Sequence, residues 1–358
     1  MFIVTFHGGS CGVGTLYAYN DQGGSGAPYL AQATPSGTTG FRDVQFQPLA
    51  SGGRFYLVNS YKAASEILPI RPTATTIASP FVSGSGTAAV CSVYHPFGMA
   101  FDGGLEVLYI SNQDSNVVIR VYGPNSTGSG AAPGQPMPVN PTLLSLFKSS
   151  SFLPGTFVAS QVPFSPPGCP TPTAVLTGQG GLAASPTGLQ PTQTPSNSVR
   201  GVAVIGSTLY VADEVANLIR QYDTTTGAYR GAIADPDNLV QSPVHLLANA
   251  DTLYITVAPG AADALVLRYD PAKSTLSAVV DRSSTNLDVK HPSGMTFDGN
   301  GYFYLGDLDG QAVYQFDSDF NPITGQFISG MPDSPEFILW VNDAWLKSSG
   351  DGSRPPAA

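Results

Sequence analysis

Charged residues are scarce in this 358-residue chain, where Asp, Glu, Lys and Arg together make up 11%. The formal net charge is −10, from 15 basic residues against 25 acidic ones. Lysine and arginine are the residues that attract phosphate groups, so we expect no binding to nucleic acid or to anionic membranes. No apolar run has the length of a membrane-spanning helix, and we therefore predict no membrane span.

Cysteine is also rare. Its three positions, Cys11, Cys91 and Cys169, form neither a CxxC pair nor a Cys/His zinc spacing. The chain could form one disulfide and keep one free thiol, or it could keep three free thiols, and the sequence does not decide between these alternatives. The chain starts directly in an apolar segment, with no signal peptide in view. The low charge and the Ser, Thr, Gly and Pro content nevertheless favour an extracellular or periplasmic location.

Turn-forming residues are abundant, with 40 Gly and 31 Pro. Short apolar runs lie between them, and the clearest example spans 291–316, with the sequence HPSGMTFDGNGYFYLGDLDGQAVYQF. Its apolar and aromatic positions predict three short strands. Asp298-Gly-Asn-Gly and Asp307-Leu-Asp-Gly predict the two turns between them. This composition is typical of an all-β protein.

The same pattern recurs along the chain. Further copies occupy 95–122, 199–222 and 242–269, and a weaker copy begins at Phe41. Equivalent tyrosines in these copies mostly lie about 50 residues apart. One such unit is too small to bury both faces of its own sheet, so the copies must pack on one another. This repetition predicts a β-propeller.

The two ends of the chain complete one another in this prediction. Strands at 2–6 and 15–19 lack a first strand, whereas 335–341 resembles a first strand with no partners after it. Pairing of this C-terminal strand into the N-terminal blade would close the ring and remove exposed sheet edges. We therefore predict a six-bladed β-propeller in which five blades are continuous and one is composite.

Length alone would suggest two domains, but all-β repeat folds of this size are often one unit. We predict a single propeller over 1–347, with a Pro-, Ser- and Gly-rich insertion at about 124–197 and a flexible tail at 348–358. The insertion is interpreted as an outer strand followed by a surface excursion. Alternatively, Thr156-Phe-Val-Ala begins a degenerate seventh blade.

The repeat resembles the NHL repeat. The likeness rests on Pro-x-Gly-Met-x-Phe-Asp, a turn, Leu-Tyr-Val/Ile-x-Asn/Asp and an aliphatic strand that ends in Tyr or Phe. It covers about two thirds of the chain. Propellers of this kind include protein- and RNA-binding modules, metal-dependent lactonases of the gluconolactonase/senescence-marker type and the amidating lyase. The resemblance therefore implies the fold and leaves the function open.

In a propeller the first strand of each blade begins at one mouth of the central channel. We expect the residue between Pro and Gly of Pro-x-Gly to face that mouth. Taken blade by blade, these residues are Arg42, Phe97, Arg200, Val244, Ser293 and Glu336. The positions that follow them are Asp43, Gly98, Gly201, His245, Gly294 and Phe337. These two rings hold the candidates for a functional site.

Two kinds of metal site follow from the resemblances. The gluconolactonase likeness implies a cage of oxygen ligands for a cation such as calcium, with Asp43 and Glu336 as the carboxylates and two nearby arginines that oppose the ion. The amidating-lyase likeness implies zinc, with His95, His245 and His291 as candidate ligands. The simpler interpretation gives these histidines to turns and to packing between blades. Either metal would make the chain a metal-dependent hydrolase or lyase.

Arg42, Arg200 and His245 suggest a different site, an anion pocket, because guanidinium groups bind carboxylates through a fork of N–H donors. Glu336 belongs to the same ligand-binding set. Alternatively, the two arginines pair with Asp43 and Glu336 and fill the channel. The main functional prediction is a binding or interaction module that receives a small molecule or a protein at the channel mouth. A metal-dependent hydrolase or lyase is the alternative.

Acidic and amide residues also recur where the second strands end. Asn112, Asp213 and Asp307 occupy equivalent places there, and the other such residues are Asn59, Asp114, Glu214 and Asp309. Such side chains accept hydrogen bonds from nearby backbone N–H groups, so we expect them to hold turns. The chain has no GxSxG, P-loop or HExxH motif, and its sequence leaves open whether it is an enzyme.

Overall fold

The structure is a computed structural model that describes residues 1–8, 14–24, 27–28, 40–49, 53–61, 64–71, 79–84, 93–113, 116–128, 130, 132–146, 154–159, 198–258, 263–285 and 287–342. Within these ranges the chain forms six four-stranded antiparallel sheets and two short helices. It divides into two compact units, which we call unit 1 (1–81 and 280–358) and unit 2 (82–279).

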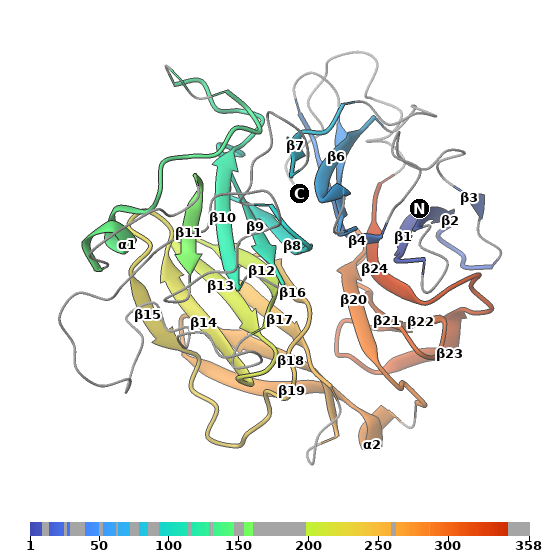
Figure 1. Ribbon diagram of the computed structural model, residues 1–358. Helices are drawn as coiled ribbons and strands as arrows, with labels where there is room; N and C mark the ends of the chain where they lie inside the picture. The colour runs from blue at the N-terminus through green and yellow to red at the C-terminus, as the bar shows by residue number, and fades with distance from the viewer. Residues whose placement is uncertain are drawn as a thin grey trace. The chain divides into compact units, whose positions relative to one another are not determined.

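One sheet of unit 1 joins the two ends of the chain. Its strand order is β24 (Pro335–Trp340), β1 (Phe2–Phe6), β2 (Thr15–Tyr19) and β3 (Ala27–Pro28). β24 and β1 are antiparallel, with Val4 opposite Ile338, and Figure 1 shows the red β24 beside the blue β1. The predicted pairing of the C-terminal strand into the N-terminal blade is therefore confirmed.

Two further sheets begin in unit 1. One has the order β4 (Phe41–Gln47), β5 (Arg54–Asn59), β6 (Glu66–Ile70) and β7 (Val82–Ser83). The other has the order β20 (Pro292–Phe297), β21 (Phe303–Asp307), β22 (Ala312–Phe316) and β23 (Pro322–Ile328). The ring of Phe2 packs edge-on against Tyr304, with centroids 4.5 Å apart, and so joins the composite sheet to the β20–β23 sheet.

Unit 2 contributes three sheets of consecutive strands. The first consists of β8 (Pro96–Phe101), β9 (Val107–Asn112), β10 (Val117–Tyr122) and β11 (Thr156–Ala159). The second consists of β12 (Val199–Ile205), β13 (Thr208–Asp213), β14 (Leu218–Asp223) and β15 (Tyr229–Ala232). The third consists of β16 (Leu246–Asn249), β17 (Thr252–Thr256), β18 (Ala264–Asp270) and β19 (Thr275–Asp281).

Strand β11 decides the interpretation of the predicted insertion. It is the outer strand of the β8–β11 sheet, where Val158 lies opposite Val118 on β10. Thr156–Ala159 therefore completes a sheet instead of beginning a seventh blade. Helix α1 (Pro141–Leu146) lies between β10 and this outer strand in the sequence. Residues 160–197, also part of the predicted insertion, lie outside the described residues.

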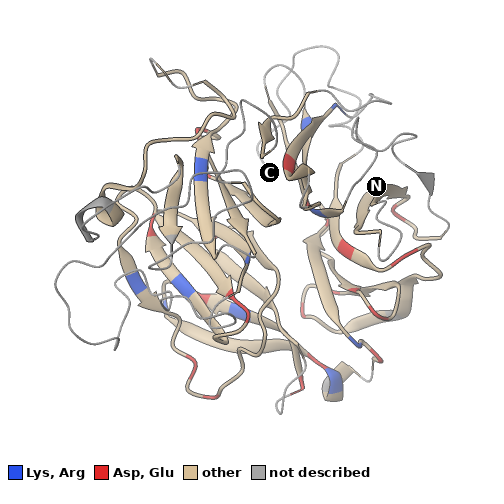
Figure 2. Ribbon diagram, in the orientation of Figure 1, with Lys and Arg blue, Asp and Glu red and all other residues tan. Residues whose placement is uncertain are grey.

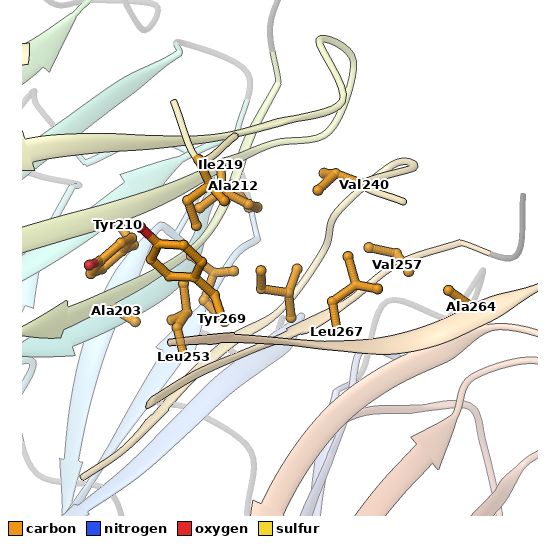
Figure 3. Packing of buried hydrophobic residues seen from close by; sticks show 13 residues of the cluster. Ala203, Tyr210, Ala212, Ile219, Val240, Leu253, Val257, Ala264, Leu267 and Tyr269 are labelled. Atoms are coloured by element: carbon orange, nitrogen blue, oxygen red, sulfur yellow. The ribbon is translucent and has the colours of Figure 1, made fainter. Parts of the chain in front are cut away.

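Neighbouring sheets of unit 2 share apolar cores. Figure 3 shows one such cluster, in which side chains of β13 face side chains of β17 and β18. The rings of Tyr210 and Tyr269 meet there at a centroid distance of 6.1 Å. Leu253 and Leu267 are fully buried beside them. Neighbouring repeats of unit 2 thus bury their apolar faces against one another, as the repetition predicts.

Several predictions concern parts of the chain that the structure does not describe. Cys11, Cys91, Cys169 and the predicted tail at 348–358 lie outside the described residues. The single domain over 1–347 stays a prediction. Of the helices in the described ranges, α1 and α2 (Arg282–Thr285), neither is long and apolar enough to pass through a lipid bilayer.

Candidate functional site

The first strand of most sheets is anchored by a polar side chain at the end of the second strand. In unit 1, Asp307 accepts hydrogen bonds from the backbone N–H groups of Lys290 and His291 at 3.1 and 2.9 Å. The same bond joins Gly40 to Asn59 in unit 1, and Tyr94 to Asn112 and Ser198 to Asp213 in unit 2. These residues hold turns, as expected, and they fix where each first strand begins.

The glycine of Pro-x-Gly allows neighbouring first strands within a unit to approach closely. In unit 2, a Cβ atom on Gly201 would lie 2.7 Å from the carbonyl oxygen of Val244. The N–H of Gly201 donates to that oxygen at 2.8 Å. In unit 1, a Cβ on Gly294 would lie 2.6 Å from the Cα of Phe337. Only glycine fits these contacts, and the side chain before it is therefore held at a defined place.

Arg200 is the most constrained polar side chain at these positions in unit 2. Its Nε and Nη2 both donate to Oε2 of Glu214, at 2.7 and 2.5 Å. Its guanidinium also lies over the ring of Phe97, 4.9 Å from the centroid. Phe97 holds the equivalent place in the adjacent sheet. One edge and one face of the guanidinium are thus occupied by protein.

The other edge of this guanidinium carries Nη1, which does not contact Glu214. Among the described residues, no hydrogen bond uses Nη1 of Arg200, and the side chain is 16% exposed. Charged side chains are sparse over the strands as a whole, where Figure 2 shows mostly tan ribbon with single blue and red positions. A fixed guanidinium with a free edge can donate to a carboxylate or carbonyl oxygen without first losing conformational freedom.

The equivalent positions in unit 1 have a different arrangement. Nη1 of Arg42 on β4 donates to Oε2 of Glu336 on β24 at 2.8 Å, and both side chains are about 15% exposed. Asp43, the next residue of β4, is buried. Ser293 on β20 is also buried, and its hydroxyl fills the space beside Gly306, where a Cβ would lie 2.6 Å from it. Arg42 therefore pairs with Glu336, which is one of the two ion pairs that the alternative to the anion pocket supposes.

Three of the four histidines were candidate zinc ligands. His245 in unit 2 is 8% exposed, and burial lowers its pKa from 6.5 to about 3, so it is neutral at physiological pH. His95, also in unit 2, has a left-handed backbone, with φ of 50°. His291 in unit 1 is half-exposed, and its Nδ1 lies 3.6 Å from a carboxylate oxygen of Asp309.

Within either unit, the described residues include no group of three His, Cys, Asp or Glu side chains that could hold a metal ion. Asp43 and Glu336 carry the only carboxylates of the predicted calcium site, and Arg42 occupies one oxygen of Glu336. The zinc and calcium sites stay predictions.

Sequence reasoning missed one participant, the carboxylate that binds Arg200. The sequence predicts a turn role for Glu214, and it offers only Asp43 and Glu336 as alternative partners of the arginines. The register of the two strands carried a signal for this pair. Val199 on β12 lies opposite Asp213 on β13. The residues that follow them, Arg200 and Glu214, therefore lie at the same end of the strand pair. Register between two predicted strands would have found this pair.

These features define a class of protein. Six four-stranded antiparallel sheets, with neighbouring sheets of each unit packed through shared apolar cores, are typical of the blades of a β-propeller. A chain of the solved nidogen/laminin complex has this fold; the TM-score is 0.55 and the identity 11%, and the match covers 94% of this chain and 96% of that one. The predicted six-bladed β-propeller is thereby confirmed.

The computationally designed Ika8 protein is less similar, with a TM-score of 0.46, 11% identity and coverage of 95% of this chain and 88% of that one. No protein-family model matches the sequence, and no curated protein matches it. The likeness shows the fold alone. The resemblance to NHL repeats in particular stays a prediction.

Proposed function

We propose that this chain is a non-catalytic interaction module of the β-propeller class that binds a protein partner. The observation that carries the proposal is the fixed guanidinium of Arg200 in unit 2. Phe97 supports its face, Glu214 holds one edge, and Nη1 is left to donate. Arginine in such a position is typical of the residues that dominate protein interfaces.

The pairing with Glu214 favours a particular kind of acceptor. Because the ion pair is close to neutral, it attracts a free anion weakly, and a partner's carbonyl or partly neutralised carboxylate suits it better. The similarity to a chain from a solved complex of nidogen and laminin supports a protein over a small molecule as the ligand. Arg42, His245 and Glu336, the other candidates for ligand binding, stay predictions.

The test is affinity capture from an extract of the source organism, with quantitative mass spectrometry. Arg200→Lys keeps the positive charge and loses the planar donor edge, so we expect it to lower the recovery of the captured partner about tenfold, the effect of losing one or two charge-assisted hydrogen bonds.

The matched control is Arg230→Lys. Arg230 also lies in unit 2 and pairs with Asp223 on the surface, away from Phe97 and Glu214. We expect the control to recover the partner as the unmodified chain does. Equal recovery by both variants, or no protein recovered above a blank resin, would reject the proposal.

A further inference from the structure

Unit 1 contains a cavity that plays no part in the site described above. Its volume is about 470 Å³, within the range of small-molecule sites. The lining residues are Tyr17, Tyr19, Gly24, Phe327, Ser329, Gly330 and Pro332. They come from β2 and the turn after it, and from β23 and the segment that follows it, so two neighbouring sheets of unit 1 form its walls.

The aromatic walls of this cavity are closely packed. The turn after β2 rests directly on β23, because a Cβ atom on Gly23 would lie 2.4 Å from the carbonyl oxygen of Phe327. Gly23 has φ of 76°, a left-handed backbone conformation that residues with a side chain disfavour. The Phe327 ring packs against Phe2 and Tyr304, with centroids 5.5 and 5.1 Å apart, and Tyr17 packs edge-on against Phe6. A site built this way needs little ordering when a ligand enters.

Two phenol hydroxyls of the cavity wall are unused. Within the described residues, neither Tyr17 nor Tyr19 has a hydrogen-bond partner for its hydroxyl, although Tyr19 is only 3% exposed. By contrast, Tyr304 in the same core receives a hydrogen bond from Gln315 at 2.8 Å. Burial and the nearby Tyr17 raise the pKa of Tyr19 to about 12, so its hydroxyl stays neutral and can donate or accept. Neither hydroxyl is itself enclosed by protein atoms, so a ligand in the cavity can reach both and form hydrogen bonds with them.

The chemistry of the lining selects a class of ligand. Among the described residues that line the cavity, none carries a charged side chain, so nothing there would neutralise an anion or hold a metal ion. Aromatic rings offer flat faces to C–H groups, and Tyr17, Tyr19 and Ser329 add three hydroxyls. A quaternary ammonium could use the rings but would leave the hydroxyls without partners.

From this combination we propose that the cavity binds a neutral saccharide, whose ring C–H faces stack on Tyr and Phe while its hydroxyl groups pair with the free phenols. The site lies in unit 1 and uses none of Arg200, Phe97 or Glu214. It is therefore independent of the proposed protein-binding role, and either can fail without the other.

Isothermal titration calorimetry with cellobiose, maltose and N,N′-diacetylchitobiose tests the proposal. We expect at least one of these disaccharides to bind with a Kd below about 10 mM, the weak end of the range for small ligands. Tyr19→Phe removes only the hydroxyl, and we expect it to weaken binding about two- to tenfold, the effect of one hydrogen bond.

A blocking variant and its control decide the location. Ser329 is exposed on the cavity rim, so Ser329→Tyr fills the cavity while the protein folds, and we expect it to abolish binding. Ser318→Tyr makes the same change at an exposed turn of the same sheet, and we expect it to bind as the unmodified chain does. Absence of binding by all three sugars, retention of binding in Ser329→Tyr, or binding of tetramethylammonium in place of sugar would each overturn the proposal.

Discussion

Arg42 in unit 1 and Arg200 in unit 2 hold equivalent places near the start of a first strand, yet their surroundings differ. Arg42 donates one N–H to Glu336, which is 294 positions away in the sequence and lies on the first strand of another sheet. Arg200 donates two N–H groups to Glu214, only 14 positions away in its own sheet, and stacks on Phe97.

The comparison shows that the same position of the repeat can have two roles, one in tethering strands and one in presenting a hydrogen-bond donor. The Arg42–Glu336 pair joins β4 to β24, so it tethers the C-terminal strand to the N-terminal part of the chain. Closing so long a stretch of chain costs entropy, and contacts at the closing strand offset that cost. The Arg200–Glu214 pair closes no long loop, and it presents a guanidinium edge instead.

Removal of the closing strand has the largest expected effect. Deletion of 334–358 takes away β24, with the buried side chains of Phe337, Ile338 and Val341. Each is worth about 1.5–3 kcal/mol, so the loss approaches the whole stability of a typical domain, about 5–15 kcal/mol. We expect the truncated chain to lack a cooperative thermal transition in circular dichroism or calorimetry.

Deletion of 348–358 alone is the matched control for this truncation. These residues belong to the predicted tail, and we expect the melting temperature to stay within about 2 °C, as for changes away from packed structure. A chain that lacks 334–358 and melts like the full one would show that β24 has no closing role, and the contrast between Arg42 and Arg200 would lose its basis.

Much of the fold was predictable because each repeat carries its own local signals. The strands of 291–316 lie where the alternation of apolar residues puts them, and Asp307 accepts the backbone bonds expected of a turn residue. The composite sheet was also predictable, since the segment 335–341 had the pattern of a first strand and the N-terminal strands lacked one.

The candidate site was less predictable, because it depends on which side chains meet rather than on local pattern. Arg42 and Glu336 were placed in one ring, and they do pair. The partner of Arg200 was not predicted, because Glu214 follows a second strand and has the position of a turn residue. The cavity beside Tyr17 and Phe327 had no signal in the sequence, since it forms where two sheets with separate patterns leave space.

Protonation of His245 gives the next largest effect and applies to unit 2. Because burial lowers its pKa from 6.5 to about 3, the folded chain binds fewer protons than the unfolded chain between these values. Its contribution to stability is thus fully present above pH 6.5 and is lost as the pH falls toward 3. We expect the free energy of unfolding in urea to drop by about 2 kcal/mol between pH 7.5 and pH 5.0.

Substitution of the histidine separates this effect from the titration of other groups. His245→Gln should flatten the pH dependence between 7.5 and 5.0, whatever it does to stability at neutral pH. Equal pH profiles for the unmodified chain and His245→Gln would mean that the buried imidazole is not the cause.

The smallest expected effect compares the two ion pairs directly. Double-mutant cycles of Arg42→Gln with Glu336→Gln, and of Arg200→Gln with Glu214→Gln, should each give a coupling of about 1 kcal/mol, because all four side chains keep some contact with solvent. Global stability alone would not distinguish the pairs. Amide hydrogen exchange should, because Arg42→Gln weakens the attachment of β24, whereas β12 keeps its backbone bond from Gly201 to Val244 in Arg200→Gln.

We therefore expect exchange at Phe337 and Ile338 to become about fivefold faster in Arg42→Gln, which is what 1 kcal/mol of local stability implies. In Arg200→Gln we expect exchange at Val202 and Ala203 to change less than about twofold. Faster exchange along β12 than along β24 would reverse the assignment, since Arg200 would then hold its sheet together and Arg42 would not. In that case a structural role would account for the position of Arg200, and its unpaired Nη1 would no longer be evidence for binding.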